Sequence, residues 1–128
     1  MEWSFIKHLL EDIGFPSHFI WLIMQCISIT QFSICLNGTL CKPFKGGRGL
    51  RQGDPLSPYL FVMAMEYLHC LLKTLWDSNQ FRGHPDCKIT KVINISFVDD
   101  LLIFYKDHLK SVDIIIDRLK NFYTTSRL

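Results

Sequence analysis

The stretch ISFVDDLLIF, residues 95–104, places two adjacent aspartates, Asp99 and Asp100, inside an apolar run. An apolar run tends to be buried, and a buried carboxylate is costly unless a partner neutralises it. Two interpretations are open. Aspartate is common in hairpin turns, where its side chain bonds to nearby backbone amides. Two carboxylates held close together also favour a bridging cation such as magnesium, which prefers carboxylate oxygens as ligands.

Composition limits the other functional classes. The chain has 128 residues, of which 48% are hydrophobic, and a formal net charge of +2. A chain of this length can bury a core, and its hydrophobic content argues against disorder. Because the net charge is small, any contact with nucleic acid has to come from a local patch of cations. Five cysteines without a C-x-x-C pair indicate neither a zinc site nor a disulfide framework.

Apolar periodicity and turn residues predict the order of elements. Helices are predicted over 3–13, 17–28 and 57–76, and a closing helix begins near Asp107. Asn37-Gly38 predicts a tight hairpin turn, and residues 88–105 read as two strands folded back at Asp99-Asp100. This order predicts the α+β class, with helices packed on one face of an antiparallel sheet.

A loop follows the Asn37-Gly38 hairpin and combines cations with glycines. Its four cations are Lys42, Lys45, Arg48 and Arg51. A solvated, flexible loop is one interpretation. The other is a backbone that approaches phosphates closely, with cations to hold them.

Neither the N-terminus nor the most apolar stretch of the chain indicates a membrane protein. The stretch FIWLIMQCISI, residues 19–29, is 11 residues long, whereas a spanning helix needs about 20. The N-terminus does not match a secretory signal. We therefore expect an intracellular protein, nuclear or organellar, without a membrane partner.

Two motifs carry a resemblance to a known family. GLRQGDPLSPYLF, residues 49–61, and FVDD, residues 97–100, resemble reverse transcriptases of non-LTR (LINE-type) retrotransposons, with plant elements looking closest. Group II intron maturases share a Gln-Gly loop and an aromatic-x-Asp-Asp box and are the alternative. The resemblance implies part of a right-hand polymerase palm and an RNA-directed DNA polymerase. Its implied cofactor is Mg²⁺, and its implied partners are an RNA template, a DNA primer and deoxynucleotides.

The resemblance also implies roles for individual residues. Asp99 and Asp100 match catalytic magnesium ligands. The residues that match the nucleotide and template site are Arg51, Gln52, Gly53, Phe97 and Val98, the last at a position where alanine is more usual. Lys45 and Arg48 are expected to face the nucleic-acid backbone. Asp54 is interpreted as a cap or turn residue before the helix at 57, which Ser57 is expected to cap.

The chain departs from the family pattern at both ends. Family members carry a first catalytic aspartate in a strand shortly before an EW pair, and here EW occupies residues 2–3. That aspartate and the fingers are therefore expected before Met1, and the thumb after Leu128. Arg127 replaces a glycine of the family. We expect residues 1–128 to be a reverse transcriptase domain fragment that is inactive alone. A non-catalytic nucleic-acid-binding remnant is the alternative.

Overall fold

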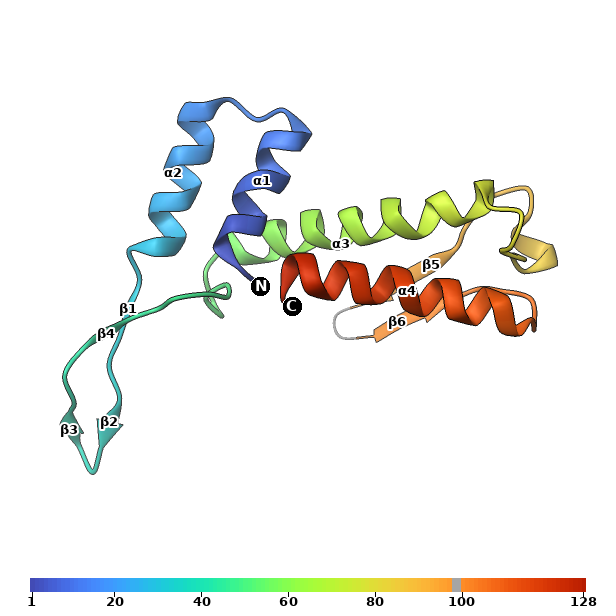
Figure 1. Ribbon diagram of the computed structural model, residues 1–128. Coiled ribbons are helices and arrows are strands. Elements are labelled where there is room, and N and C mark those ends of the chain that lie inside the picture. The colour runs from blue at the N-terminus through green and yellow to red at the C-terminus, as the bar shows by residue number, and fades with distance from the viewer. Residues whose placement is uncertain (98–99) are drawn as a thin grey trace. The chain divides into compact units, whose positions relative to one another are not determined.

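The protein forms four α-helices joined by short strands and 3-10 turns in the part that the structure describes, residues 1–97 and 100–128 (Figure 1). The structure is a computed structural model. The chain divides into two compact units: Met1–Phe61 together with Ser126–Leu128, and Val62–Thr125. None of the helices in the described part is long and apolar enough to cross a membrane.

The first unit opens with two helices that lie side by side. Helix α1 (Trp3–Ile13) ends at Gly14, whose φ of +91° and backbone N–H bonds to the carbonyls of Leu10 and Glu11 form a left-handed C-terminal cap. Helix α2 (Ser17–Ser28) starts directly after Pro16. Both helices have the predicted bounds. Their buried side chains are Phe5, Ile6, Leu9 and Leu10 from α1 and Ile20, Ile23 and Ile27 from α2.

A β-hairpin follows α2 and contains four two-residue strands. Strands β2 (Cys35–Leu36) and β3 (Thr39–Leu40) are joined by Asn37 and Gly38, which have φ angles of +49° and +80°. Two consecutive positive φ angles are those of a type I′ turn. Strands β1 (Gln31–Phe32) and β4 (Phe44–Lys45) extend the same hairpin towards its base. The hairpin predicted at Asn37-Gly38 is confirmed.

The returning strand of this hairpin contains one extra residue. The Cys41 N–H donates to the Ile34 carbonyl at 2.8 Å, while further along Phe32 is paired with Phe44. Two residues on the outgoing strand therefore face three on the return, which is a β-bulge at Lys42 and Pro43. Proline has no amide donor for the ladder, so a bulge is a position that it tolerates.

The long third helix changes geometry near its end. Helix α3 runs over Ser57–Lys73, and the next turn, η1 (Thr74–Asp77), is a 3-10 helix. The α-helix predicted to Trp76 is therefore wrong in its last turn. Four side chains along this segment are buried within the second unit: Ala64, Leu68, Leu72 and Leu75. Helix α4 (Leu109–Ser126) begins two residues after the predicted start and buries Ser111, Ile115 and Phe122.

The second hairpin contains one of the two aspartates at the start of a strand. Strands β5 (Asn94–Phe97) and β6 (Asp100–Ile103) are antiparallel, and Asp100 is paired with Phe97. The predicted strands over 88–105 are too long, because β5 begins only at Asn94 and Lys91 before it has a φ of +51°. The 3-10 helix η2 (Pro85–Cys87) comes just before this range. Asp99, the other predicted turn residue, lies outside the described residues, as does Val98.

The predicted α+β class is confirmed. In the second unit, α3 and α4 cover one face of the β5–β6 hairpin (Figure 1). The described strands pair two by two, as β1 with β4, β2 with β3 and β5 with β6.

Gly83 leaves room for an aromatic ring. A Cβ atom on Gly83 would overlap the six-membered ring of Trp76. Trp76 also makes an edge-to-face contact with Phe81, with ring centroids 5.6 Å apart. The absence of a side chain at position 83 is therefore a condition for this packing.

We expect Gly83→Ala to destabilise the protein by about 1–3 kcal/mol, because the new methyl group forces Trp76 or the backbone to move. Gly47→Ala is the matched control, since a Cβ there meets nothing within 4 Å; its effect should stay within about 0.5 kcal/mol. Urea denaturation of the two variants and the parent chain measures both. Equal stability of the two variants would contradict the packing at Gly83.

The residue after α4 keeps a glycine-like conformation. Arg127 has a φ of +48°, the left-handed conformation that glycine adopts at least cost. The Glu2 N–H donates to the Ser126 carbonyl at 2.9 Å, and Arg127 Nη1 lies 3.6 Å from Glu2 Oε1. The backbone at this position thus matches the glycine that the family resemblance implies.

Arg127→Gly should be more stable locally than Arg127→Ala by about 1 kcal/mol, because both lose the ion pair and only alanine retains the left-handed strain. Hydrogen exchange of the Glu2 amide reports on the contact between Glu2 and Ser126. Its protection should be about fivefold higher in the glycine variant. Higher protection in the alanine variant would show that the strain is not important.

Candidate functional site

The Arg51-Gln52-Gly53 segment is a tight turn attached to the start of α3. The Asp54 N–H donates to the Arg51 carbonyl at 3.3 Å, and Gly53 has a φ of +82°. A turn with a positive φ at its third residue requires glycine there. The Ser57 hydroxyl donates to the same Arg51 carbonyl at 2.7 Å. The backbone of this turn is therefore held from two sides.

The turn exposes two side chains that can form hydrogen bonds to a ligand. Arg51 and Gln52 are both exposed. Arginine is a bidentate donor suited to phosphate, and glutamine offers a donor and an acceptor together. A rigid backbone with exposed polar side chains is suited to contact a ligand, because little conformational entropy of the backbone is lost on binding.

Asp54 is a turn residue, as predicted. Its Oδ1 accepts a hydrogen bond from the Leu56 N–H at 2.8 Å, and its carbonyl accepts from the Ser57 N–H at 3.1 Å. The bond between the Asp54 side chain and the Leu56 N–H is the one that aspartate commonly makes in turns, to the backbone amide two residues later. The side chain of Ser57 was predicted to cap α3, whereas its hydroxyl donates backwards to Arg51.

The glycine-rich loop is anchored to the beginning of α1. The Trp3 indole N–H donates to the Gly49 carbonyl at 2.8 Å, and the Gly49 N–H donates to the Met1 carbonyl at 2.8 Å. The sequence placed Trp3 only at the start of the predicted helix over 3–13. The contact was not predicted because its two residues are 46 positions apart, and no local pattern connects them.

The cations of this loop are exposed. Lys45 is the last residue of β4, paired with Gln31, and Arg48 immediately precedes Gly49. The pKa of the Met1 amino group is lowered, first by burial and then by repulsion from the nearby Arg48 guanidinium. The loop is thus anchored at Gly49, with the Lys45 and Arg48 side chains on the surface.

The β5–β6 hairpin has one covered face and one exposed face. Asn94 is buried, and its Oδ1 lies 2.8 Å from Nδ1 of His69 on α3. The other face holds Ile95, Phe97 and Leu102, which are 52%, 76% and 61% exposed. Asp100, as the cross-strand partner of Phe97, shares this exposed face.

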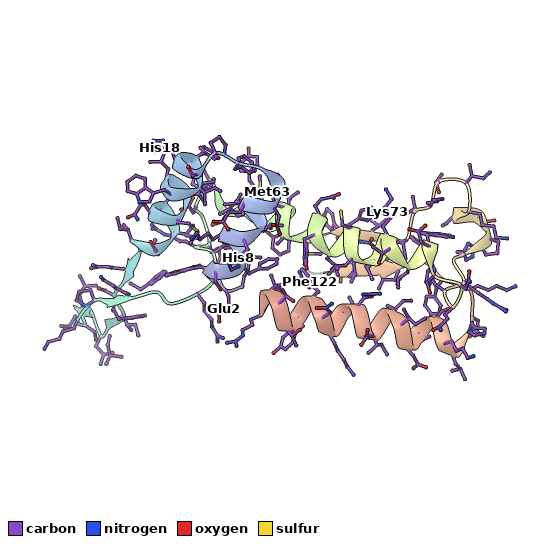
Figure 2. All side chains as sticks on the ribbon, turned by 45° about the horizontal axis from the view of Figure 1, so that its top comes forward. Glu2, His8, His18, Met63, Lys73 and Phe122 are labelled. Carbon is purple, nitrogen blue, oxygen red and sulfur yellow. The ribbon has the colours of Figure 1, made fainter. Side chains whose placement is uncertain are left out.

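The helices behind this hairpin are packed through aromatic and aliphatic side chains. Phe122 of α4 lies towards α3 (Figure 2), and its ring centroid is 6.2 Å from that of Tyr67. Together with Leu68 and Leu72 of α3, this contact forms part of the core of the second unit. The exposed face with Asp100 therefore belongs to a hairpin supported by a packed layer.

The chemistry of the predicted metal ligands fits magnesium in part. Asp100 supplies an exposed carboxylate, a hard oxygen ligand of the kind that Mg²⁺ prefers. Within residues 1–97 and 100–128, no group of three His, Cys, Asp or Glu side chains comes together. Asp99 lies outside these residues. The described residues thus provide one of the expected ligands.

The predicted site residues are divided between the two units. Those of the first unit are Lys45, Arg48, Arg51, Gln52 and Gly53. Phe97 and Asp100 belong to the second unit. Within the first unit, hydrogen bonds hold the backbone at Gly49 and at the Arg51 turn. Within the second unit, Phe97 and Asp100 are paired across the hairpin.

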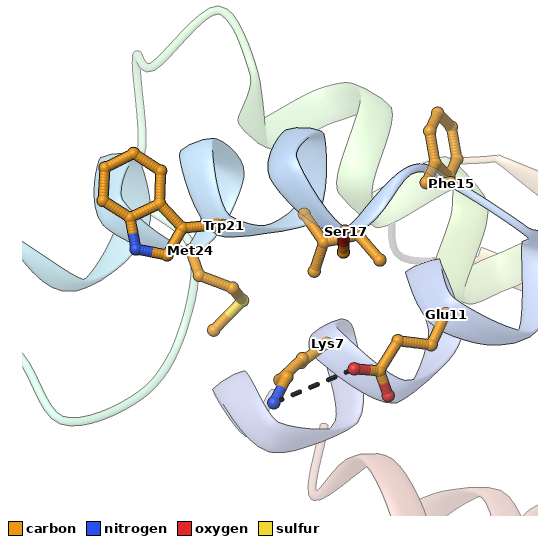
Figure 3. Close-up of a pocket in the computed structure, with 7 residues that line it drawn as sticks. Lys7, Glu11, Phe15, Ser17, Trp21 and Met24 are labelled. Atoms are coloured by element: carbon orange, nitrogen blue, oxygen red, sulfur yellow. Dashed lines mark ion pairs between the residues drawn. The ribbon is translucent and has the colours of Figure 1, made fainter.

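A cavity between α1 and α2 contains none of the predicted site residues (Figure 3). Its volume is about 560 Å³, and its walls include Phe15, Trp21 and Met24. Lys7 Nζ and Glu11 Oε1 form an ion pair at 3.8 Å along its α1 side. The charged groups of this cavity wall therefore pair with each other.

Comparison with known proteins assigns the family. The profile of the reverse transcriptase (RNA-dependent DNA polymerase) family matches residues 1–128. The chain therefore belongs to this family of polymerases.

The relatives include proteins of transposable elements. The chain is 28% identical over 107 residues to the uncharacterized 149 kDa protein of transposon TX1 from Xenopus laevis, which covers 84% of this chain and 8% of that protein. It is 28% identical over 117 residues to a retrovirus-related Pol polyprotein from a type-2 retrotransposable element of Drosophila melanogaster, covering 91% of this chain and 10% of the polyprotein. The chain thus spans a tenth or less of these two relatives.

A third relative is similar over a shorter stretch. An uncharacterized mitochondrial protein of Arabidopsis thaliana is 43% identical over 54 residues, which are 41% of this chain and 44% of that protein.

Asp54→Ala should destabilise the chain by about 1 kcal/mol, because the Leu56 N–H loses its acceptor. Asp54→Asn retains an acceptor oxygen at the same position and should stay within about 0.5 kcal/mol of the parent. Urea denaturation in the absence of divalent cations measures both. An equal loss in the two variants would mean that the negative charge, and not the turn bond, is what position 54 requires.

Proposed function

We propose that residues 1–128 form part of the palm of an RNA-directed DNA polymerase from a LINE-type, non-LTR retrotransposon. The observation that carries the proposal is the order of two local structures in a chain that matches the family over its whole length. The tight turn at Arg51-Gln52-Gly53 precedes α3, and the hairpin with Phe97 and Asp100 follows that helix. The short similarity to an Arabidopsis protein supports a plant element as the source.

In this proposal Asp99 and Asp100 bind magnesium. Bound magnesium would supply Lewis acidity to the attack of a primer hydroxyl on the α-phosphate of a deoxynucleotide. Asp100 offers its carboxylate from the first position of β6, on the exposed face of the hairpin. The resemblance requires a further carboxylate from a strand that precedes residue 1 in the family order.

The remaining residues act on the nucleic acid and the nucleotide. The exposed side chains of Arg51 and Gln52 would contact the incoming nucleotide and the template base, on a turn whose shape depends on Gly53. Phe97, and Val98 beside it in sequence, would contact the nucleotide or the primer end. Lys45 and Arg48 would bind the phosphate backbone of the template–primer duplex.

A second function is favoured by the cations of the first unit. The side chains of Lys42, Lys45, Arg48 and Arg51 are all exposed, and the backbone between them is anchored at Gly49. These features suffice for weak, salt-sensitive binding of nucleic acid without chemistry. The test of catalysis must therefore separate binding from nucleotide transfer.

Primer extension on an RNA template with Mg²⁺ tests the proposal. We expect the chain, when extended upstream to include the further aspartate and the fingers, to extend the primer, and the 128-residue chain to be inert. Asp99→Asn and Asp100→Asn in the extended chain should each lower the rate at least about 100-fold, because a metal ligand is lost. Asp77→Asn, an exposed residue of η1, is the matched control and should retain the parent rate.

Binding of the template–primer, measured on the same variants, completes the test. Asp99→Asn should bind as the parent does while failing to extend the primer. Extension that survives both substitutions at 99 and 100 would refute the assignment of the metal ligands. Binding without extension in every chain would favour the non-catalytic function.

A further inference from the structure

A basic pocket lies in the second unit, and none of the residues assigned a role above lines it. Its volume is about 370 Å³, at the small end of the range for ligand pockets. Three cations line it, namely Arg82, Lys88 and Lys106, while Trp76 and Gly83 form part of its wall. No acidic residue of the described chain lines it.

Backbone hydrogen bonds hold two of these cations beside each other. The Lys106 N–H donates to the Arg82 carbonyl at 2.8 Å, next to an antiparallel bridge between Gly83 and Tyr105. The Arg82 N–H donates to the hydroxyl of Ser111 at 3.1 Å, and Ser111 is fully buried in the first turn of α4. The positions of Arg82 and Lys106 are therefore set by the fold.

The charges of these cations are not balanced by nearby carboxylates. In the described part of the chain, neither Arg82, Lys88 nor Lys106 takes part in an ion pair. The nearby Asp86 instead has its Oδ2 at 3.7 Å from Nδ1 of His84. Like charges on paired strands repel each other, so an anion between them would stabilise this arrangement.

The aromatic wall adds a second observation. The Trp76 indole N–H is buried and has no hydrogen-bond partner among the described residues. A buried donor without an acceptor is costly and calls for an explanation. The same ring is held against Gly83 and Phe81. The Trp76 ring lines the pocket, so the signal of its indole N–H reports on a ligand that binds there.

We propose that this pocket binds a phosphate group of a single nucleic-acid strand. The guanidinium of Arg82 matches phosphate geometry with two parallel donors, and Lys88 and Lys106 add point charges. The volume suits one phosphate with its sugar better than a longer segment. The choice of nucleic acid over a free phosphate ion rests on the proposed function, whereas the affinity for phosphate rests on the pocket alone.

NMR of the tryptophan indole N–H groups tests the pocket directly, because the chain has only three tryptophans. The protein is the 128-residue chain, which contains every residue of the pocket. It is titrated with single-stranded dT12 and, separately, with inorganic phosphate. The Trp76 signal, assigned by Trp76→Phe, should shift with dT12 at lower concentration than with phosphate, while the signal of Trp21 stays in place.

Charge-removing variants test which cations hold the ligand. Lys88→Ala and Lys106→Ala should each weaken the dT12 affinity that is read from the Trp76 signal by about tenfold. Each should also lower the slope of log affinity against log salt, by at most about 0.7, which is the value for one phosphate contact of a single strand. Lys73→Ala and Lys120→Ala remove exposed cations of the same unit that do not line the pocket, and should change the affinity less than twofold.

The outcomes separate this inference from the proposed function. A Trp76 shift with inorganic phosphate and none with dT12 would overturn the nucleic-acid assignment. No shift with either ligand, or equal effects of the control variants, would overturn the pocket as a phosphate site. A Trp76 shift that depends on Lys88 and Lys106 supports the pocket even if primer extension fails in every chain.

Discussion

The hydrogen bond between His69 and Asn94 determines which face of the β5–β6 hairpin is covered. It joins a half-buried histidine of α3 to a buried asparagine at the first position of β5, at 2.8 Å. Because side chains alternate along a strand, an inward Asn94 places Ile95 and Phe97 outward. Asp100, the cross-strand partner of Phe97, then shares the exposed face. A slip of one residue would turn the aspartate towards the helices.

The two units use different means to present polar side chains. In the first unit, the Arg51 carbonyl accepts from the Asp54 amide and the Ser57 hydroxyl, so a turn of exposed side chains is rigid without being buried. In the second, a packed layer of α3 and α4 supports a hairpin that carries its carboxylate on the outer face. Both arrangements place functional groups on loops and strand ends while apolar side chains of the helices form the support.

The basic pocket also presents its charged side chains from loops and strand ends, where we propose that they bind phosphate. Its three cations are Arg82, which follows η1, Lys88, which follows η2, and Lys106, which follows β6. The antiparallel bridge between Gly83 and Tyr105 joins the first and the last of these segments. If the pocket binds a strand of nucleic acid, the second unit carries both a carboxylate site and a backbone contact. The protein then has a second group of cations for binding nucleic acid, outside the glycine-rich loop. The sequence indicated only the cations of that loop.

The sequence by itself determined the local elements whose ends are marked by special residues. Gly14, Pro16 and Asn37-Gly38 restrict the backbone directly, so α1 and α2 have the predicted bounds and the first hairpin turns where it was predicted to turn. The family motifs are also local, and they led to the family that residues 1–128 match. The tertiary structure alone decided what depends on distant partners: the anchoring of Gly49 by Trp3, the covered face of β5–β6, and the meeting of Arg82 with Lys106. The physical reason is that a hydrogen bond between distant segments leaves no periodic signal in either of them.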